Sequence, residues 1–186
     1  MKQLFTCGIL LAGIASVGLA ECKEPTPWEA SPPMKASVTI GGKNIWIGYH
    51  APSAKGRKVF GGEGALQPDN SVWRLGAQNA TCMHTEGELD FAGVKVPPGD
   101  YSLYVDLDQG KWKLIVNKQT GQWGINRDGS TTRQPAQDVG TIPLTMSKPA
   151  APVEQLKISL ADAGANKGKL AIEWENVAAS TTFAVK

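Results

Sequence analysis

The feature that most constrains the fold is the spacing of the apolar side chains, which recur at every second position over long stretches of the chain. Successive side chains of a β-strand point to opposite faces, so this alternation predicts antiparallel strands with one face on a core and one toward water. The runs are Ile45, Ile47, Tyr49; Tyr101, Leu103, Val105, Leu107; Trp112, Leu114, Val116; Leu156, Ile158, Leu160; and Leu170, Ile172, Trp174. No sustained helical period appears after residue 20.

Turn-forming residues lie between these runs where hairpins need them. Gly41-Gly42 separates the segments Ala36–Ile40 and Lys43–His50, and Asp108-Gln109-Gly110 separates two later segments in the same way. We therefore predict an all-β domain, an antiparallel β-sandwich of about eight to ten strands, with a barrel as the alternative.

Two segments do not fit the strand pattern and are predicted to be long loops. Residues 51–68 contain two prolines, four glycines and the basic group Lys55, Arg57 and Lys58, and residues 117–138 contain Trp123 among glycines. Long loops on a rigid β scaffold are where binding residues are usually found.

The start of the chain indicates export. Residues 1–20 combine a single early positive charge, Lys2, with an apolar stretch and end in Gly18 and Ala20, the small residues that a signal peptidase reads. We expect cleavage before Glu21, a Pro-rich leader over 21–34 suited to an extended tether, and one domain over 35–186. The expected location is the periplasm or the extracellular space, with no transmembrane segment after cleavage.

Charge and size exclude several classes of protein. The chain has 19 basic and 17 acidic residues and no block of like charges, so it lacks the field that a nucleic-acid binder needs. A domain of this size buries about 70% of the surface of its unfolded chain, which is enough for a core without a metal. No cofactor is expected.

Two cysteines follow the predicted cleavage point, Cys22 and Cys82. Two is the smallest number that can pair in an oxidising compartment, and a disulfide closing so long a loop would contribute on the order of 4 kcal/mol in the chain-entropy model. The alternative is that Cys22 stays unpaired in a mobile leader.

Five ordered blocks of sequence carry a resemblance to a known family: Pro52–Gly61, Val72–Ala77 with Ala80-Thr81, Val96–Leu103, Asn117–Gly124, and Trp174-Glu175-Asn176 with Phe183-Ala184-Val185. They resemble an exported bacterial family known as domain of unknown function twenty-nine-eleven. The resemblance implies an exported β-rich domain and supplies no activity, cofactor or site residue. One departure is Gln78-Asn79, where the family commonly has Asn and then an acid.

Two arginines are the first candidates for a ligand site. Arg74 stands at the edge of an apolar run, and Arg57 lies in a glycine-flanked loop that could bring the two together. A guanidinium offers five fixed donors that match a carboxylate or a phosphate, so the pair would bind an anionic group. The structural alternative is that both bond loop carbonyls or an acid such as Asp69 or Asp100.

Aromatic and polar loop residues extend the candidate site. Trp123, Trp73 and Trp46 would form a platform for a sugar ring, with Gln122 and Asn126 bonding its hydroxyls. The alternative is that these tryptophans belong to the core, with Trp123 the best exception because it lies in a Gly-rich loop. The ligand-binding residues we predict are Arg57, Arg74, Trp123, Asn79 and His50.

Signals for metal binding and catalysis are weaker. His50, Cys82, His84 and a methionine are the ligand types of a copper centre, although Cys82 as a core or disulfide residue is the alternative. No nucleophile elbow, zinc-protease motif, phosphate-binding loop or Cys-x-x-Cys motif is present. We therefore predict a non-enzymatic binding domain for a small molecule, a glycan or an envelope protein. The alternatives are a hydrolase-type enzyme with His50 or His84 as general base, and the copper site.

Overall fold

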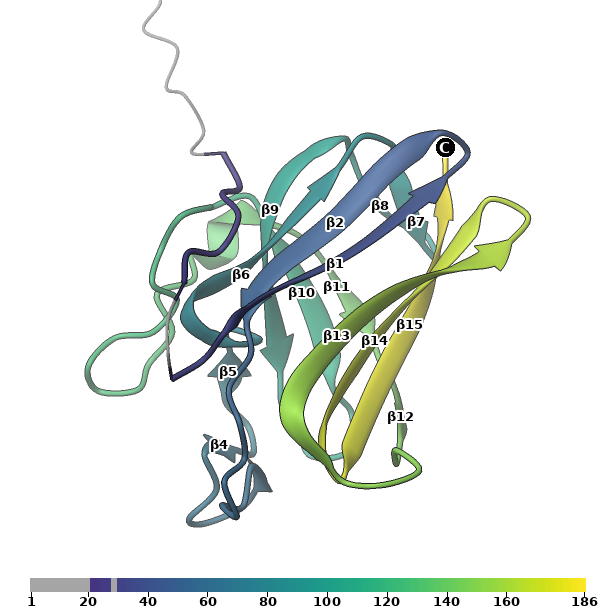
Figure 1. Ribbon diagram of the computed structural model, residues 1–186. Helices are drawn as coiled ribbons and strands as arrows, with labels where there is room; N and C mark the ends of the chain where they lie inside the picture. The colour runs from purple at the N-terminus through teal and green to yellow at the C-terminus, as the bar shows by residue number, and fades with distance from the viewer. Residues whose placement is uncertain (1–20, 28–29) are drawn as a thin grey trace, which may run out of the picture.

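The computed structural model describes residues 21–27 and 30–186, in which two antiparallel β-sheets pack face to face (Figure 1). The predicted sandwich is confirmed, and neither sheet closes into a barrel. The predicted signal peptide, residues 1–20, lies outside the described residues. Within the described chain, no helix is long and apolar enough to span a membrane.

The first sheet has seven strands, in the order β1-β2-β6-β9-β10-β11, with β5 paired to the end of β9. Its strands are β1 (Pro33–Ile40), β2 (Lys43–His50), β5 (Val72–Trp73), β6 (Ala77–Thr85), β9 (Gly99–Asp106), β10 (Lys113–Asn117) and β11 (Asp138–Pro143). The predicted Gly41-Gly42 turn joins β1 to β2.

The second sheet has six strands, in the order β13-β14-β15-β7-β8, with β12 paired to β15. Its strands are β7 (Leu89–Phe91), β8 (Val94–Val96), β12 (Thr145–Ser147), β13 (Val153–Gly164), β14 (Lys167–Glu175) and β15 (Val177–Val185). A small parallel pair, β3 (Phe60–Gly61) and β4 (Gln67–Pro68), projects below the sandwich, and a 3-10 turn, η1 (Pro135–Gln137), precedes β11.

The number of strands exceeds the eight to ten expected from the sequence. The strands β2, β9, β10, β13 and β14 coincide with the alternating runs, and β1 contains the predicted segment Ala36–Ile40. The strands β6, β11 and β15 are not among those runs. The remaining strands, β3, β4, β5, β7, β8 and β12, have two or three residues each. A strand that short shows no measurable alternation, so the sequence pattern misses it. Two of these short strands, β3 and β4, lie in the segment that was predicted to be a long loop.

The core lies between the two sheets and takes every second residue of the long strands. Leu103 and Ile47 of the first sheet and Ile172 of the second are fully or nearly fully buried in it. At one end, Phe60 packs edge-on against Trp112, with 4.7 Å between ring centroids, and Trp73 stacks on Trp174 at 5.8 Å. This aromatic cluster closes the end of the sandwich from which β3 and β4 project.

The outer face of the first sheet is covered by two segments without regular strands. The loop between β10 and η1 lies over β9, where Gln122 Nε2 donates to the Tyr104 hydroxyl at 2.7 Å. The leader, residues 21–27, lies against β2 and β6 and is joined to β6 by a disulfide between Cys22 and Cys82, with 5.7 Å between their Cα atoms. The leader is thus fixed to the sheet rather than extended away from it.

Candidate functional site

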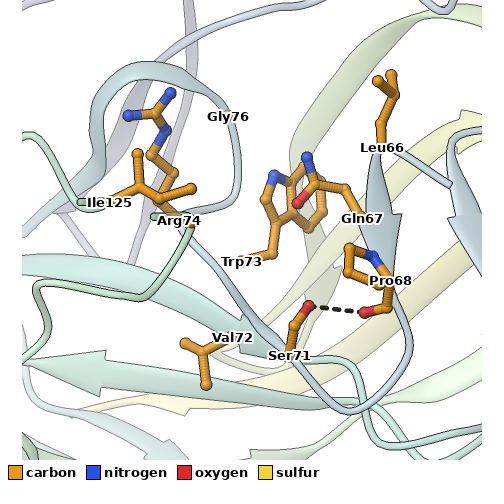
Figure 2. A pocket seen from close by; sticks show the side chains of 10 residues that line it. Leu66, Gln67, Pro68, Ser71, Val72, Trp73, Arg74, Gly76 and Ile125 are labelled. Atoms are coloured by element: carbon orange, nitrogen blue, oxygen red, sulfur yellow. Dashed lines mark hydrogen bonds between the residues drawn. The ribbon is translucent and has the colours of Figure 1, made fainter. Parts of the chain in front are cut away.

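A cleft of about 200 Å³ lies beside β5, at the place where the first sheet divides. In Figure 2, Arg74 and Ile125 lie on one side of it, Leu66, Gln67 and Pro68 lie on the other, and Trp73 stands between them. The remaining residues of its wall are Ser71, Val72, Gly76 and Gly129. The cleft therefore joins three segments far apart in sequence: the β4 region, β5 and the loop after β10.

The pairing of β5 with β9 sets the directions of the two key side chains. Trp73 is opposite Val105 and points into the core, so Arg74 points to the outer face, near Tyr104. The chain turns sharply after Arg74 because Leu75 has a φ of 58°, and the Thr81 hydroxyl donates to the Leu75 carbonyl at 2.8 Å. This turn leads directly into β6 and holds Arg74 at the rim of the sheet.

Arg74 is held by Trp123 and by no carboxylate. Its Nη1 donates to the Trp123 carbonyl at 2.9 Å, and its guanidinium lies over the indole of the same residue at 5.1 Å, a cation–π distance. Burial lowers the pKa of Arg74, partly offset by nearby Tyr104. In the described part of the chain no acidic side chain forms an ion pair with Arg74. Among the described residues the guanidinium has no other hydrogen bond, so four of its five N–H donors have no partner there.

The loop crosses Arg74 closely because Gly124 has no side chain. A Cβ at Gly124 would lie 2.9 Å from the Arg74 Cβ and 3.1 Å from the Ala80 Cβ, and its φ of +89° also favours glycine. Backbone hydrogen bonds fix the crossing, from Ala80 N–H to the Gln122 carbonyl at 3.1 Å and from Thr132 N–H to the Gly124 carbonyl at 3.2 Å. The loop is therefore packed in place over the arginine.

Trp73 contributes a buried donor to the wall of the cleft. Its side chain is 3% exposed, and its indole nitrogen has no hydrogen-bond partner among the residues that the structure describes. In Figure 2 this nitrogen is on the side of the ring toward Arg74. An unpaired buried N–H costs about 1–3 kcal/mol, so an acceptor that reached it would be stabilised.

Apolar side chains at the rim are unusually exposed. Leu66, in the wall of the cleft, is 36% exposed, and Trp123, which covers Arg74, is 50% exposed. The predicted platform of three tryptophans is not formed, because Trp73 belongs to the core and Trp46 stacks on His84 at 5.8 Å on another part of the outer face. Of the three, Trp123 alone is an exposed loop residue beside the cleft.

Arg57 does not join Arg74. Its Nε donates to the Ala54 carbonyl at 2.9 Å and its Nη2 to the Ser53 carbonyl at 2.7 Å, so the side chain folds back on its own loop. Arg57 is not part of the wall of the cleft. The expectation of a paired arginine site is therefore not met, and Arg57 has the structural role that was its alternative.

His50 and Asn79 lie at the leader rather than at the cleft. They share the wall of a cavity of about 140 Å³ with Pro25 and Thr26, and the His50 Nε2 is 2.8 Å from the Thr26 carbonyl. His50 is 6% exposed, so the leader closes it off from solvent. Asn79 also borders a neighbouring cavity of about 350 Å³ between the leader and the loop after β10.

The second histidine forms a pair with an acid on the open surface. His84 Nδ1 lies 2.8 Å from Asp100 Oδ1, with the two side chains 32% and 25% exposed. The copper ligands considered in the sequence analysis included Cys82, but the Cys82 sulfur is bonded to Cys22 and is therefore not a free thiolate ligand. Among the described residues, no three His, Cys, Asp or Glu side chains lie close enough to hold a metal ion.

A family model described as Protein of unknown function (DUF2911) matches residues 31–183. The chain belongs to that family. The resemblance seen in the five sequence blocks is thereby confirmed. No curated protein and no solved structure matches the chain.

Of the residues predicted from the sequence, Arg74 lines the cleft and Trp123 covers Arg74 beside it. Gln67, Leu66 and Ile125, which also line the cleft, were not predicted. Leu66 and Gln67 belong to a segment without alternation, and Ile125 is one apolar residue in a loop. The only usable signal was Gly124, since a glycine beside an exposed tryptophan suggests a close backbone approach. The completed arrangement can bind an acceptor group but provides no nucleophile aligned with a base.

Proposed function

We propose that this domain is an exported, non-enzymatic binding domain that takes a small molecule in the Arg74 cleft. The observation that carries the proposal is the Arg74 guanidinium, which is partly buried beside a cleft and forms no ion pair with an acid of the described residues. Removing a charge from water is unfavourable unless hydrogen bonds or an opposite charge compensate for it. A bound ligand would supply that compensation.

The shape of the surroundings supports binding over a purely structural role. A structural arginine is satisfied by its neighbours, as Arg57 is by two carbonyls of its own loop. Arg74 has one such bond and lines the cleft, and the buried Trp73 N–H in the same wall has no partner among the described residues. Concave sites with a few convergent polar groups in an apolar wall are typical of small-molecule binding.

Native mass spectrometry of the protein purified from the periplasm tests this proposal. We expect the mature chain to begin at Glu21 and to carry a small-molecule adduct. The adduct should be lost in Arg74→Gln and retained in Arg57→Gln, the matched control in which an arginine is removed away from the cleft. A wild-type protein free of adducts, or an adduct that persists in Arg74→Gln, would contradict the proposal.

A second candidate function rests on the pair of His84 and Asp100. An acid against Nδ1 orients the imidazole and leaves Nε2 free, which is the arrangement of a general base. The pair lies on the sheet surface and outside the Arg74 cleft. If a hydrolytic activity is found and His84→Gln abolishes it while Arg74→Gln does not, this candidate replaces the first.

A further inference from the structure

We infer that the ligand of the Arg74 cleft is a small carboxylate with an apolar body. This inference rests on the binding function proposed above and adds the chemical class of the ligand. Four properties of the cleft support it: its polar groups are mainly hydrogen-bond donors, its one charged side chain is positive, most of its other side chains are apolar, and its volume is small.

The strongest polar groups at the cleft can only donate. A guanidinium has five N–H groups and no acceptor, and an indole N–H is likewise a donor only. Arg74 therefore favours a ligand group made of acceptors, and the Trp73 N–H would add a second donor once a neighbouring side chain moves. The planar fork of a guanidinium matches the two oxygens of a carboxylate, which gives two parallel hydrogen bonds.

The charge of the wall fits one negative charge. Arg74 is the one ionisable side chain among the ten residues that line the cleft. A carboxylate would be neutralised by it, whereas a phosphate carries a charge of about −1.5 to −2 at neutral pH and would be left partly uncompensated. The cleft thus favours a carboxylate over a phosphate.

The rest of the wall fits an apolar body better than a sugar. Leu66, Pro68, Val72 and Ile125 present hydrocarbon, and Trp73 adds the edge of its ring. Ser71 already donates its hydroxyl hydrogen to the Pro68 carbonyl at 2.6 Å, so besides the donors Arg74 and Trp73 only the Gln67 amide is left in the wall to bind hydroxyl groups. Most hydroxyls of a sugar ring would lose their water without gaining a partner.

The volume sets the size of the ligand. At about 200 Å³ the cleft is smaller than the roughly 300–1,000 Å³ of pockets for drug-sized molecules. The indole nitrogen of Trp73 exposes less than 1 Å², so it becomes reachable only when a neighbouring side chain moves. Arg74 is therefore the first point of contact, and its substitution is the test of the inference.

The probe is hexanoate, compared with the neutral hexanamide, with glucuronate and with inorganic phosphate. Each is titrated into isotope-labelled mature protein while the indole N–H signals are followed by NMR. We expect hexanoate to shift the Trp73 indole signal in a saturable manner and to bind at least tenfold more tightly than the other three probes. Arg74→Gln should weaken hexanoate binding about tenfold or more, and Arg57→Gln should leave it unchanged.

Arg74→Lys keeps the charge but loses the planar fork, so we expect hexanoate affinity between those of the wild type and Arg74→Gln. This variant also guards against misfolding of Arg74→Gln, since a lysine stem covers a similar surface. Three results would overturn the inference but leave the cleft as a binding site. Hexanamide could bind as tightly as hexanoate, glucuronate or phosphate could bind more tightly, or Arg74→Gln could leave the affinity for hexanoate unchanged. Failure of every probe to shift a cleft signal, together with the absence of a native adduct, would remove the proposed function as well.

Discussion

The two faces of the seven-stranded sheet are closed in different ways. On the inner face, Tyr101, Leu103 and Val105 of β9 pack against the second sheet in one apolar core. On the outer face of the same strand, Ser102 and Tyr104 are covered by a loop that holds them through hydrogen bonds. The inner face follows from the local alternation of apolar residues. The outer cover, formed by the leader (residues 21–27) and the loop between β10 and η1, depends on contacts between residues far apart in the sequence. The cleft lies at the edge of this outer cover.

The largest expected difference is between neighbouring residues of β9. Leu103→Ala removes a fully buried side chain from the inner core and should lower the free energy of unfolding by about 2–5 kcal/mol. Ser102→Ala, one position away, removes a hydrogen-bonded hydroxyl from the outer face and should cost about 1 kcal/mol. Urea unfolding of both variants measures this. Equal losses would mean that the outer cover is as important to stability as the core.

The next largest effect concerns the leader. Cys22 and Cys82 close a loop with a sequence separation of 60, and removal of such a disulfide typically costs about 2–4 kcal/mol. The double variant Cys22→Ala, Cys82→Ala should show this loss in urea, and reduction of the wild type should lower its midpoint to match. A wild-type midpoint that does not respond to reductant would show that the disulfide does not hold the leader in the folded protein.

The sequence predicted the inner face well because its information is local. Each alternating run marked a long strand, and Gly41-Gly42 marked the turn between β1 and β2. The outer cover could not be predicted in the same way. A run of prolines indicates an extended chain, but it does not show which part of the sheet that chain contacts. In the structure Pro25 lies so close to Gly48 that a Cβ at Gly48 would be only 2.9 Å from the proline ring. Only the folded sheet brings those two residues together.

Gly124 offers a direct test of the outer cover. Gly124→Ala should lower the free energy of unfolding by about 1–3 kcal/mol, because the new methyl group meets Arg74 and Ala80 and the φ of +89° disfavours a side chain. Gly129→Ala is the matched control, with a φ of +86° and nothing within 4 Å of the added Cβ. Thermal unfolding should place the control between Gly124→Ala and the wild type. A larger loss in Gly129→Ala would contradict the close crossing of Arg74.

The two arginines show why the site was only partly predictable. In the sequence Arg57 and Arg74 look alike, each in or beside a candidate loop. Arg57 bonds carbonyls three and four residues away, while Arg74 bonds a carbonyl 49 residues away. Which of two arginines is satisfied locally depends on turn geometry that residue types do not specify. In the apolar wall, Leu66 and Pro68 lie in or beside the two-residue strand β4 and Ile125 lies in a loop, so none of the three belongs to an alternating run.

The three tyrosines of the chain report on both faces and give the smallest expected effect. Tyr49 and Tyr101 belong to the inner core and Tyr104 to the outer cover, and burial raises the pKa of each phenol above its usual value near 10. The folded protein therefore keeps its phenols protonated at pH values where the unfolded chain loses those protons. Stability from this source is complete below about pH 10 and falls as the pH rises further.

Titration of tyrosinate absorbance, with Phe substitutions to assign each signal, separates the two faces. In the wild type we expect all three phenols to titrate above the value of free tyrosine. Because Tyr104 is covered by the loop that crosses at Gly124, the Gly124→Ala change should bring the pKa of Tyr104 back toward 10 while Tyr49 and Tyr101 stay raised. If all three signals move together, the two faces open as one cooperative unit, and the distinction between a locally coded core and a separately fixed outer cover does not hold.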